Sequence, residues 1–170
     1  TRPTELLGIF EPDCMALGRW WASSTARRSC RGGYGVLPVP AELPGALDTL
    51  DAMLDGSRSA FETFLRIPLP ARRRNIELDW KDYDDLGYLS GHSVGEAEGA
   101  MFDALVQTHA SLDIPLIILS AGQLDAPQLG ELFYFLELTA ALCAAADGLN
   151  PFERKRSSPT RAQAAALLRG

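Results

Sequence analysis

The sequence predicts an α/β fold with a mainly parallel sheet covered by helices on both faces. Four short apolar or alternating runs, bounded by Gly, Pro or Asp, have the length and pattern of strands. Segments with helical spacing separate them, and this alternation requires crossover connections between parallel strands. The predicted strands are residues 5–10, 34–39, 60–67 and 114–120. The last run, IPLIILS, has no polar alternation, so we expect it near the sheet centre.

Two helices are predicted in the first half of the chain. One starts from Asp13 and includes Trp20 and Trp21, which lie about 100° apart on a helix. Only one tryptophan can therefore face the core fully, and we expect the other to lie beneath a partner domain. The second helix is shorter, stops at Gly56 and carries apolar residues at Leu47, Leu50, Met53 and Leu54.

Two further helices have clear boundary signals. Ser93 and Glu96 have the spacing of a capping box, and the helix they start carries on one face Met101, Leu105 and Thr108. A long helix follows Pro127, ends at Gly148 and carries on one face Leu129, Leu132, Phe133, Leu136, Ala140 and Cys143. Residues 71–92 have no sustained period and mix arginines with aspartates, which predicts a long surface connection.

The composition indicates one soluble domain. The chain has 170 residues, 46% of them hydrophobic and 22% charged, which is enough for a real core. A net charge of -6 argues against nucleic acid as a partner, because such binding needs a basic surface. No apolar run approaches the roughly 20 residues that span a bilayer, so we expect a cytoplasmic protein without a membrane partner. The chain begins without methionine, and we expect it to be a piece of a longer protein.

Few residues indicate catalysis or metal binding. Cys14, Cys30 and Cys143 lie far apart without C-x-x-C spacing, so neither a disulfide framework nor a zinc site is predicted. His92 and His109 are the only histidines, and for both a structural role is favoured over a catalytic one. His109 falls near the C-terminal end of its predicted helix, where it can serve local carbonyls.

Two patterns resemble anion sites. Gly32, Gly33 and Gly35 resemble part of a phosphate cradle, but they lead into a strand and not into a helix, so a turn is favoured. Residues 72–74 and 154–156 are all basic and could grip an anionic ligand, although a solvated charge cluster is the favoured interpretation.

Six stretches of the sequence, taken in order, resemble a known family. They are ELLGIFEP with GRWW, GYGVLPV, LDG-SRSAFET, DDLGYLSGHSV, FDALVQTHASLDIP and LGELFYFLELTAALCAAADGLNPFE. Their order and spacing resemble the second, C-terminal sugar-isomerase domain of the glucose-6-phosphate isomerase family over nearly the whole chain. The last stretch is the most specific, because it runs into a segment similar to the family's G-V-N-P-F-D, namely Gly148, Leu149, Asn150, Pro151 and Phe152.

The resemblance implies that residues 1–170 form one flavodoxin-like three-layer sandwich, the second domain of an enzyme that interconverts glucose 6-phosphate and fructose 6-phosphate. Such enzymes use no metal and no organic cofactor. A carboxylate moves a proton between two sugar carbons through an enediolate, a histidine helps to open the sugar ring, and cations stabilise the developing charge. The implied partners are a sugar phosphate, a preceding sugar-isomerase domain or subunit, and a second copy in a homodimer.

The family's two proton-transfer groups are missing from the matching positions. Its base glutamate belongs to an E-S-x-G-K turn, and the place of that turn is taken by Arg27, Arg28, Ser29, Cys30 and Arg31. A guanidinium is charged at neutral pH and cannot abstract a proton. Counting back from Gly56 places the family's histidine at Leu47, whose side chain carries no exchangeable proton. A shift of a few residues in these stretches would instead bring Glu42 or Asp48 to a functional position.

Arginines occupy the remaining positions of interest. Residues 150–153 fit the family's N-P-F-D, while Arg154 replaces its glutamine and Arg161 replaces a lysine that faces the substrate. Arg161 is therefore the predicted catalytic residue, because it can supply positive charge to an enediolate. Arg27, Arg31 and Arg154 are the predicted substrate-binding residues.

Three functions follow from these observations. The leading hypothesis is the second domain of a glucose-6-phosphate isomerase-like protein, inactive as an isolated chain. The second is a non-catalytic module that binds a sugar phosphate or another small anion through its arginines. The third is an interaction domain, for which an extensive apolar surface without a pocket would be the evidence.

Overall fold

The computed structural model has a four-stranded parallel sheet. It describes residues 4–29, 35–54, 60–67, 75–77, 82–83, 85–122, 125–153 and 158–169. The strands are β1 (Thr4–Ile9), β2 (Leu37–Glu42), β3 (Ala60–Arg66) and β4 (Leu116–Ser120). Their order is β2-β1-β3-β4, and each neighbouring pair is parallel. This is the strand order of flavodoxin-like sheets, so the predicted fold class is confirmed.

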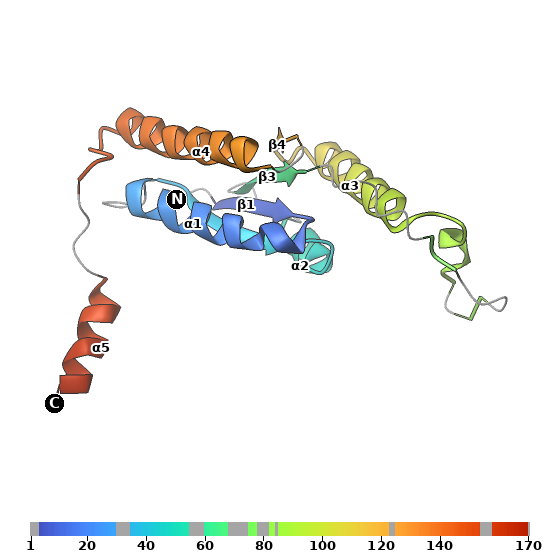
Figure 1. Ribbon diagram of the computed structural model, residues 1–170, viewed down its shortest axis with the longest axis horizontal. Helices are drawn as coiled ribbons and strands as arrows, with labels where there is room; N and C mark the ends of the chain where they lie inside the picture. Colours follow the sequence, from blue (N-terminus) through green and yellow to red (C-terminus); the bar gives the residue numbers. More distant parts are fainter. Residues whose placement is uncertain are drawn as a thin grey trace.

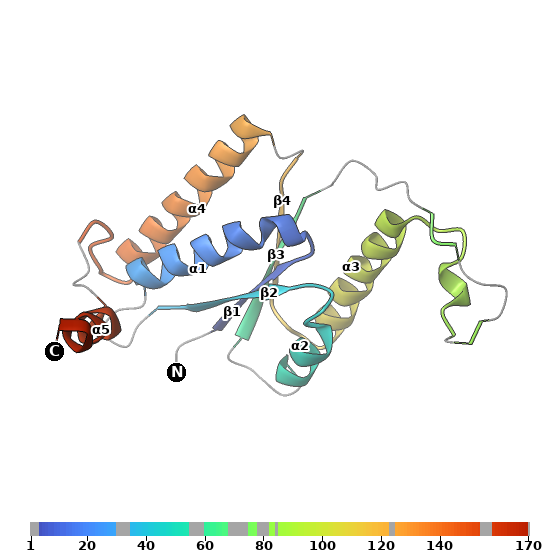
Figure 2. The same cartoon turned by 60° about the horizontal axis from the view of Figure 1, so that its bottom comes forward.

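Helices cover both faces of the sheet, as Figure 2 shows. On one face lie α1 (Met15–Ser29) and α4 (Ala126–Ala146), and on the other lie α2 (Leu47–Leu54) and α3 (Val94–Ser111). Short 3-10 helices precede α1 and α3, namely η1 (Pro12–Cys14) and η2 (Gly87–Leu89). The molecule therefore has three layers, and every predicted helix is present.

The sequence patterns gave no prediction of a fifth helix, α5 (Pro159–Arg169). Figure 1 shows this helix standing away from the sheet, and it buries none of its residues. Its alanines and leucines are good helix formers, but without a clear apolar stripe they give only a weak periodic signal.

Each face of the sheet has its own core. The core beneath α1 and α4 contains Leu7, Ile9, Leu65, Trp21 and Leu136. The core beneath α2 and α3 contains Leu6, Phe64, Leu50, Phe102 and Leu105. Alternate residues of β1 and β3 thus serve opposite cores, which explains why these two central strands are apolar along most of their length.

The predicted position of the last strand was wrong. β4 lies at the sheet edge beside β3, and the central positions belong to β1 and β3. Ile117 and Ile118 are 47% and 43% exposed. The apolar run therefore reflects a surface that this chain leaves uncovered. β2 runs later than predicted, to Glu42, because Pro38 and Pro40 are tolerated in an edge strand.

The start of α3 was predicted correctly, but its buried face was not. Ser93 Oγ accepts a hydrogen bond from the Glu96 N–H at 3.2 Å, and Glu96 Oε2 accepts one from the Ser93 N–H at 2.7 Å. The helix buries Phe102, Leu105 and His109, whereas Met101 is 41% exposed. Hydrophobicity alone therefore misassigned the face by about one residue, because the buried stripe contains a histidine.

The inner face of α4 was predicted well. Leu136 and Ala140 are buried, and Ala144 takes the buried place expected for Cys143, which is exposed. Trp21 of α1 faces the core, and the ring of Trp20 packs edge-on against Phe133 of α4 at a centroid distance of 4.5 Å. Trp20 is therefore half-buried against α4, and the expected partner domain over it stays a prediction.

The expectation that no apolar run approaches membrane length was wrong for α4. This helix has 21 residues with a mean hydropathy of 1.5, enough to cross a membrane by length and composition alone, and 17% of that stretch is buried. In this fold α4 forms a layer against α1. Arg28 forms an ion pair with Glu137, and Ser24 Oγ donates to Glu137 Oε1 at 2.8 Å.

Gly8 allows the central strand to pass close to two core side chains. A Cβ at this position would lie 2.5 Å from Phe64 Cδ1 and 2.8 Å from Leu43 Cδ1. We expect Gly8→Ala to lower the free energy of unfolding by about 1–3 kcal/mol through overpacking, measured by urea denaturation. Gly99→Ala is the control, because nothing lies within 4 Å of the Cβ that alanine would add at this position. That variant should gain up to about 1 kcal/mol from helix propensity, and equal stabilities for both variants would contradict the packing.

Candidate functional site

Two pockets lie along the carboxyl edge of the sheet, the edge at which open α/β folds bind ligands. The larger has a volume of about 560 Å³ and lies at the ends of β1 and β2. Its wall is mostly apolar, and its charged residues are Glu42 and Glu98. The other has a volume of about 480 Å³, lies where β4 leads towards α4, and has Ser120, Gln128 and Glu131 as its polar residues. No cation lines either pocket within the described ranges, so neither offers a phosphate group an opposite charge there.

A buried histidine lies between two carboxylates beneath α2 and α3. His109 of α3 is 1% exposed, and its Nδ1 lies 2.7 Å from Glu62 Oε2 of β3. Its Nε2 lies 2.9 Å from Asp51 Oδ1 of α2. Glu62 is fully buried, whereas 59% of the Asp51 side chain is exposed. The cluster joins one strand to two helices and belongs to the amino half of β3, away from the edge with the pockets.

The two carboxylates determine the charge of His109. Burial by itself would lower the pKa of His109, but hydrogen bonds to Asp51 and Glu62, together with their negative charges, raise it above its ordinary value. Burial raises the pKa of Glu62, and the contacts with His109 offset only part of that rise. Both shifts have the same consequence for the pair of Glu62 and His109, because each raised pKa makes this pair keep its shared proton to a higher pH.

This cluster has the residue types of acid–base catalysis, but its burial argues for a structural role. A catalytic base must reach the proton it removes directly or through one water. Both ring nitrogens of His109 are already engaged, and no member of the cluster lines either of the two pockets. The favoured structural role of His109 therefore fits, although its partners are two acids and not the local carbonyls expected from its place on the helix.

A second buried carboxyl lies on the other face of the sheet. Thr63 Oγ1 donates to Glu5 Oε1 at 2.8 Å, and Glu5 is 7% exposed. Burial raises the pKa of Glu5, and the hydrogen bond from Thr63 offsets part of the rise. Sequence patterns gave no signal for this pair, because a glutamate at the start of a strand normally faces solvent.

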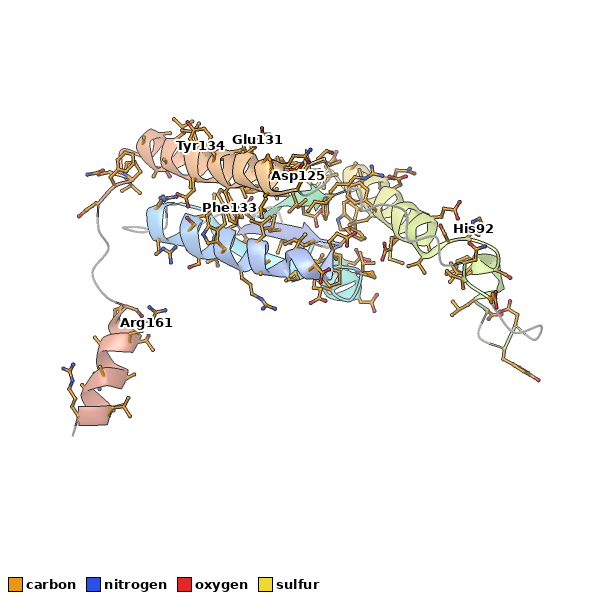
Figure 3. The ribbon with its side chains drawn as sticks, viewed as in Figure 1. His92, Asp125, Glu131, Phe133, Tyr134 and Arg161 are labelled. Atoms are coloured by element: carbon orange, nitrogen blue, oxygen red, sulfur yellow. The ribbon has the colours of Figure 1, made fainter. Side chains whose placement is uncertain are left out.

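Of the predicted arginines, the structure describes Arg27 and Arg161, and neither of these two lines a pocket. Arg27 lies near the end of α1, where it donates to Ser23 Oγ at 2.9 Å on the surface. Arg161 is exposed on α5, far from the sheet in Figure 3. Arg31 and Arg154 lie outside the described residues, so their roles stay predictions, as do those of Arg27 and Arg161.

Two of the positions considered for proton transfer begin α2. Leu47 starts this helix and packs against the core, so the position predicted for the family's histidine holds an apolar anchor. Asp48 is exposed one residue later. Of the two carboxylates considered as alternatives, Glu42 lines the larger pocket and Asp48 does not.

The remaining candidate residues have simple environments. His92 is exposed, with its Nδ1 3.9 Å from Glu96 Oε2. Gly35 has a φ of 93°, which fits the favoured turn. The two basic runs and Cys30 lie outside the described residues, and Cys14 and Cys143 are free thiols. Within the part of the chain that the structure describes, no group of three or more His, Cys, Asp or Glu could hold a metal ion.

An apolar surface runs along the outer side of α4. Figure 3 shows Glu131 and Tyr134 on the side away from α1 and Phe133 towards it. Tyr134, Phe135 and Leu142 are 72%, 49% and 62% exposed. This surface occurs together with pockets, so it does not match the pattern expected of a pure interaction domain.

Comparisons with known proteins identify the relatives of this chain. No family model matches it. Over 166 residues it is 28% identical to the glucose-6-phosphate isomerase of Listeria monocytogenes serotype 4b (strain F2365), covering 97% of this chain and 37% of that protein. Over 152 residues it is 30% identical to the glucose-6-phosphate isomerase of Streptococcus thermophilus (strain ATCC BAA-491 / LMD-9), covering 89% of this chain and 34% of that one. The predicted resemblance to the glucose-6-phosphate isomerase family is confirmed.

The chain spans only about a third of the length of these curated relatives, and it matches their C-terminal region. A solved structure supports the fold. A hypothetical protein from Thermus thermophilus matches 99% of this chain and 42% of its own, with a TM-score of 0.81 and 16% identity. The activity of the longer glucose-6-phosphate isomerases therefore remains a separate question for this chain.

Two glutamates should affect stability with opposite dependence on pH. The pKa of Glu5 is higher in the folded protein than in the unfolded chain. The free energy of unfolding of the wild type should therefore fall relative to that of Glu5→Gln as the pH rises above about 4.5, and the fall should end once the pH exceeds the folded pKa. Glutamine keeps the acceptor for Thr63.

The pKa of Glu96 is lowered by hydrogen bonds from Ser93. The wild type should therefore have a higher free energy of unfolding than Glu96→Gln at neutral pH, and this difference should be lost in acid. Chemical denaturation between pH 3 and 8 measures both, and parallel profiles would contradict the assignment.

Proposed function

We propose that this chain is the second sugar-isomerase domain of a glucose-6-phosphate isomerase-like protein and that it does not isomerise the sugar by itself. The proposal is supported by a resemblance that covers 97% of the chain. In the predicted alignment of the motifs, Arg27 and Leu47 take the positions of the two proton-transfer groups. Isomerisation moves a proton between adjacent carbons and needs a group that gains and loses one near neutral pH. A guanidinium and an aliphatic side chain cannot do so.

In this proposal the arginines act at a surface that a neighbouring domain completes. Arg161 supplies positive charge to an enediolate, and Arg27, Arg31 and Arg154 bind the substrate. Two observations support a shared site: α5 projects away from the sheet without burying a residue, and the relatives are about three times longer than this chain. The partners are a sugar phosphate, a preceding sugar-isomerase domain or subunit, and a second copy in a homodimer, acting in the cytoplasm without a metal or organic cofactor.

An isomerase assay tests the inactivity directly. Purified chain is added to fructose 6-phosphate, and glucose 6-phosphate is detected through a coupled dehydrogenase. We expect no turnover above the background of a heat-denatured sample, because no side chain at the matching positions transfers protons. Sustained turnover would refute the proposal. If Glu42→Gln then removed that turnover, the Glu42 carboxylate in the larger pocket would be the base.

A second candidate function is a non-catalytic module that binds a sugar phosphate. It is favoured by the predicted arginines, because Arg161 keeps the positive charge of the family's lysine and Arg27 and Arg154 add positive charge. We expect calorimetric titration with glucose 6-phosphate to show binding, and Arg161→Gln to weaken it by about tenfold or more, because a charged hydrogen bond is lost. Arg169→Gln is the matched control, since Arg169 is also exposed on α5 but has no predicted role. No heat at millimolar ligand would rule this function out.

A further inference from the structure

The short helix α2 is held to the fold in two different ways. Its apolar side packs through Leu50, which is 3% exposed and belongs to the core beneath α2 and α3. Its next residue, Asp51, bonds to His109 Nε2 at 2.9 Å. With only eight residues, α2 has little intrinsic stability, so these tertiary contacts decide where it lies.

His109 is surrounded by two carboxylates and apolar side chains. Glu62 approaches from β3 and Asp51 from α2, and these are the charged groups that act on the ring. The neighbours of Glu62 in the flanking strands are Leu6 of β1 and Leu116 of β4. Of the charged residues that follow α2, Asp55 and Arg58 lie outside the described residues.

The same helix contributes to the larger pocket. Leu50, together with Ala46 immediately before the helix, lines that pocket at the carboxyl ends of β1 and β2. We propose that Asp51, His109 and Glu62 form a proton-dependent latch that fixes α2 and thereby sets one wall of the 560 Å³ pocket. This inference does not depend on the proposed function, because it concerns the shape of the pocket and not the chemical class of its ligand.

The number of ring protons explains the latch. The imidazolium donates one N–H to Glu62 and the other to Asp51, so both bonds are charge-assisted. Neutral imidazole has one N–H, so one ring nitrogen then presents its lone pair to a carboxylate. The bond to Asp51 is the one that opens, because this carboxylate is 59% exposed and water can replace the ring, whereas Glu62 has no access to water.

The direction of the response follows from the raised pKa of His109. Below the ordinary value of 6.5 the latch is fully closed, and it opens as the pH rises through the higher folded value. Alkaline conditions should therefore loosen α2, while the strands β1 and β3 between the two cores stay folded.

Hydrogen exchange of α2 amides, with parallel NMR titration of the histidine rings, tests the latch. As the pH is raised, the protection factors of the amides of residues 50–54, corrected for intrinsic exchange rates, should fall by about tenfold or more. The midpoint of this fall should coincide with the midpoint of the His109 titration. Exposed His92 is the internal control for the ring signals. Amides of β1 and β3 should keep their protection throughout.

Two variants on α2 separate the latch from general helix stability. Asp51→Asn should lower the His109 midpoint and reduce α2 protection below that midpoint by about tenfold or more, because the charged bond is lost. Asp48→Asn removes a charge from the same helix without touching His109 and should match wild type. The proposal is wrong if α2 protection does not follow the His109 titration, or if the two variants behave alike.

Discussion

The hydrogen-bonded pair of Glu62 and His109 constrains one whole layer of this fold. Glu62 lies on a central strand with no exposure to solvent, and a carboxylate in that position must have a partner. His109 supplies it, and this fixes α3 along and around its axis relative to β3. Asp51 extends the link to α2. Removing one partner of such a buried pair typically costs about 3–5 kcal/mol, so the pair restricts which arrangements of this layer can fold.

The opposite layer is organised by a different kind of contact. Trp20 packs on Phe133, and Arg28 and Ser24 bind Glu137, so these contacts join α1 and α4 in addition to the core that the two helices share. Partial burial would raise the pKa of Glu137, but the hydrogen bonds from Arg28 and Ser24 hold it below its ordinary value. This layer leaves the outer side of α4 apolar and exposed, in keeping with a chain that spans about a third of its relatives.

Local features of the structure could be predicted from sequence, and non-local ones could not. The capping box at Ser93 and the end of α4 at Gly148 depend on neighbouring residues, and both were predicted. The edge position of β4 depends on which strand pairs with β3, and an apolar run looks the same at the edge or the centre. The partners of His109 lie 47 and 58 residues away, beyond the reach of any periodic pattern. Family motifs correctly indicated the relatives, whereas the roles of the predicted arginines stay predictions.

The central claim is that the buried acid–base groups of this chain hold its layers together and are not free for chemistry. Nitrogen-15 NMR of the His109 ring tests it most directly, because the two nitrogen shifts report how many protons the ring carries. Below the ordinary value of 6.5 the account predicts two ring protons, both protected from exchange with water. A neutral ring with one proton, or ring protons that exchange as fast as those of exposed His92, would contradict it.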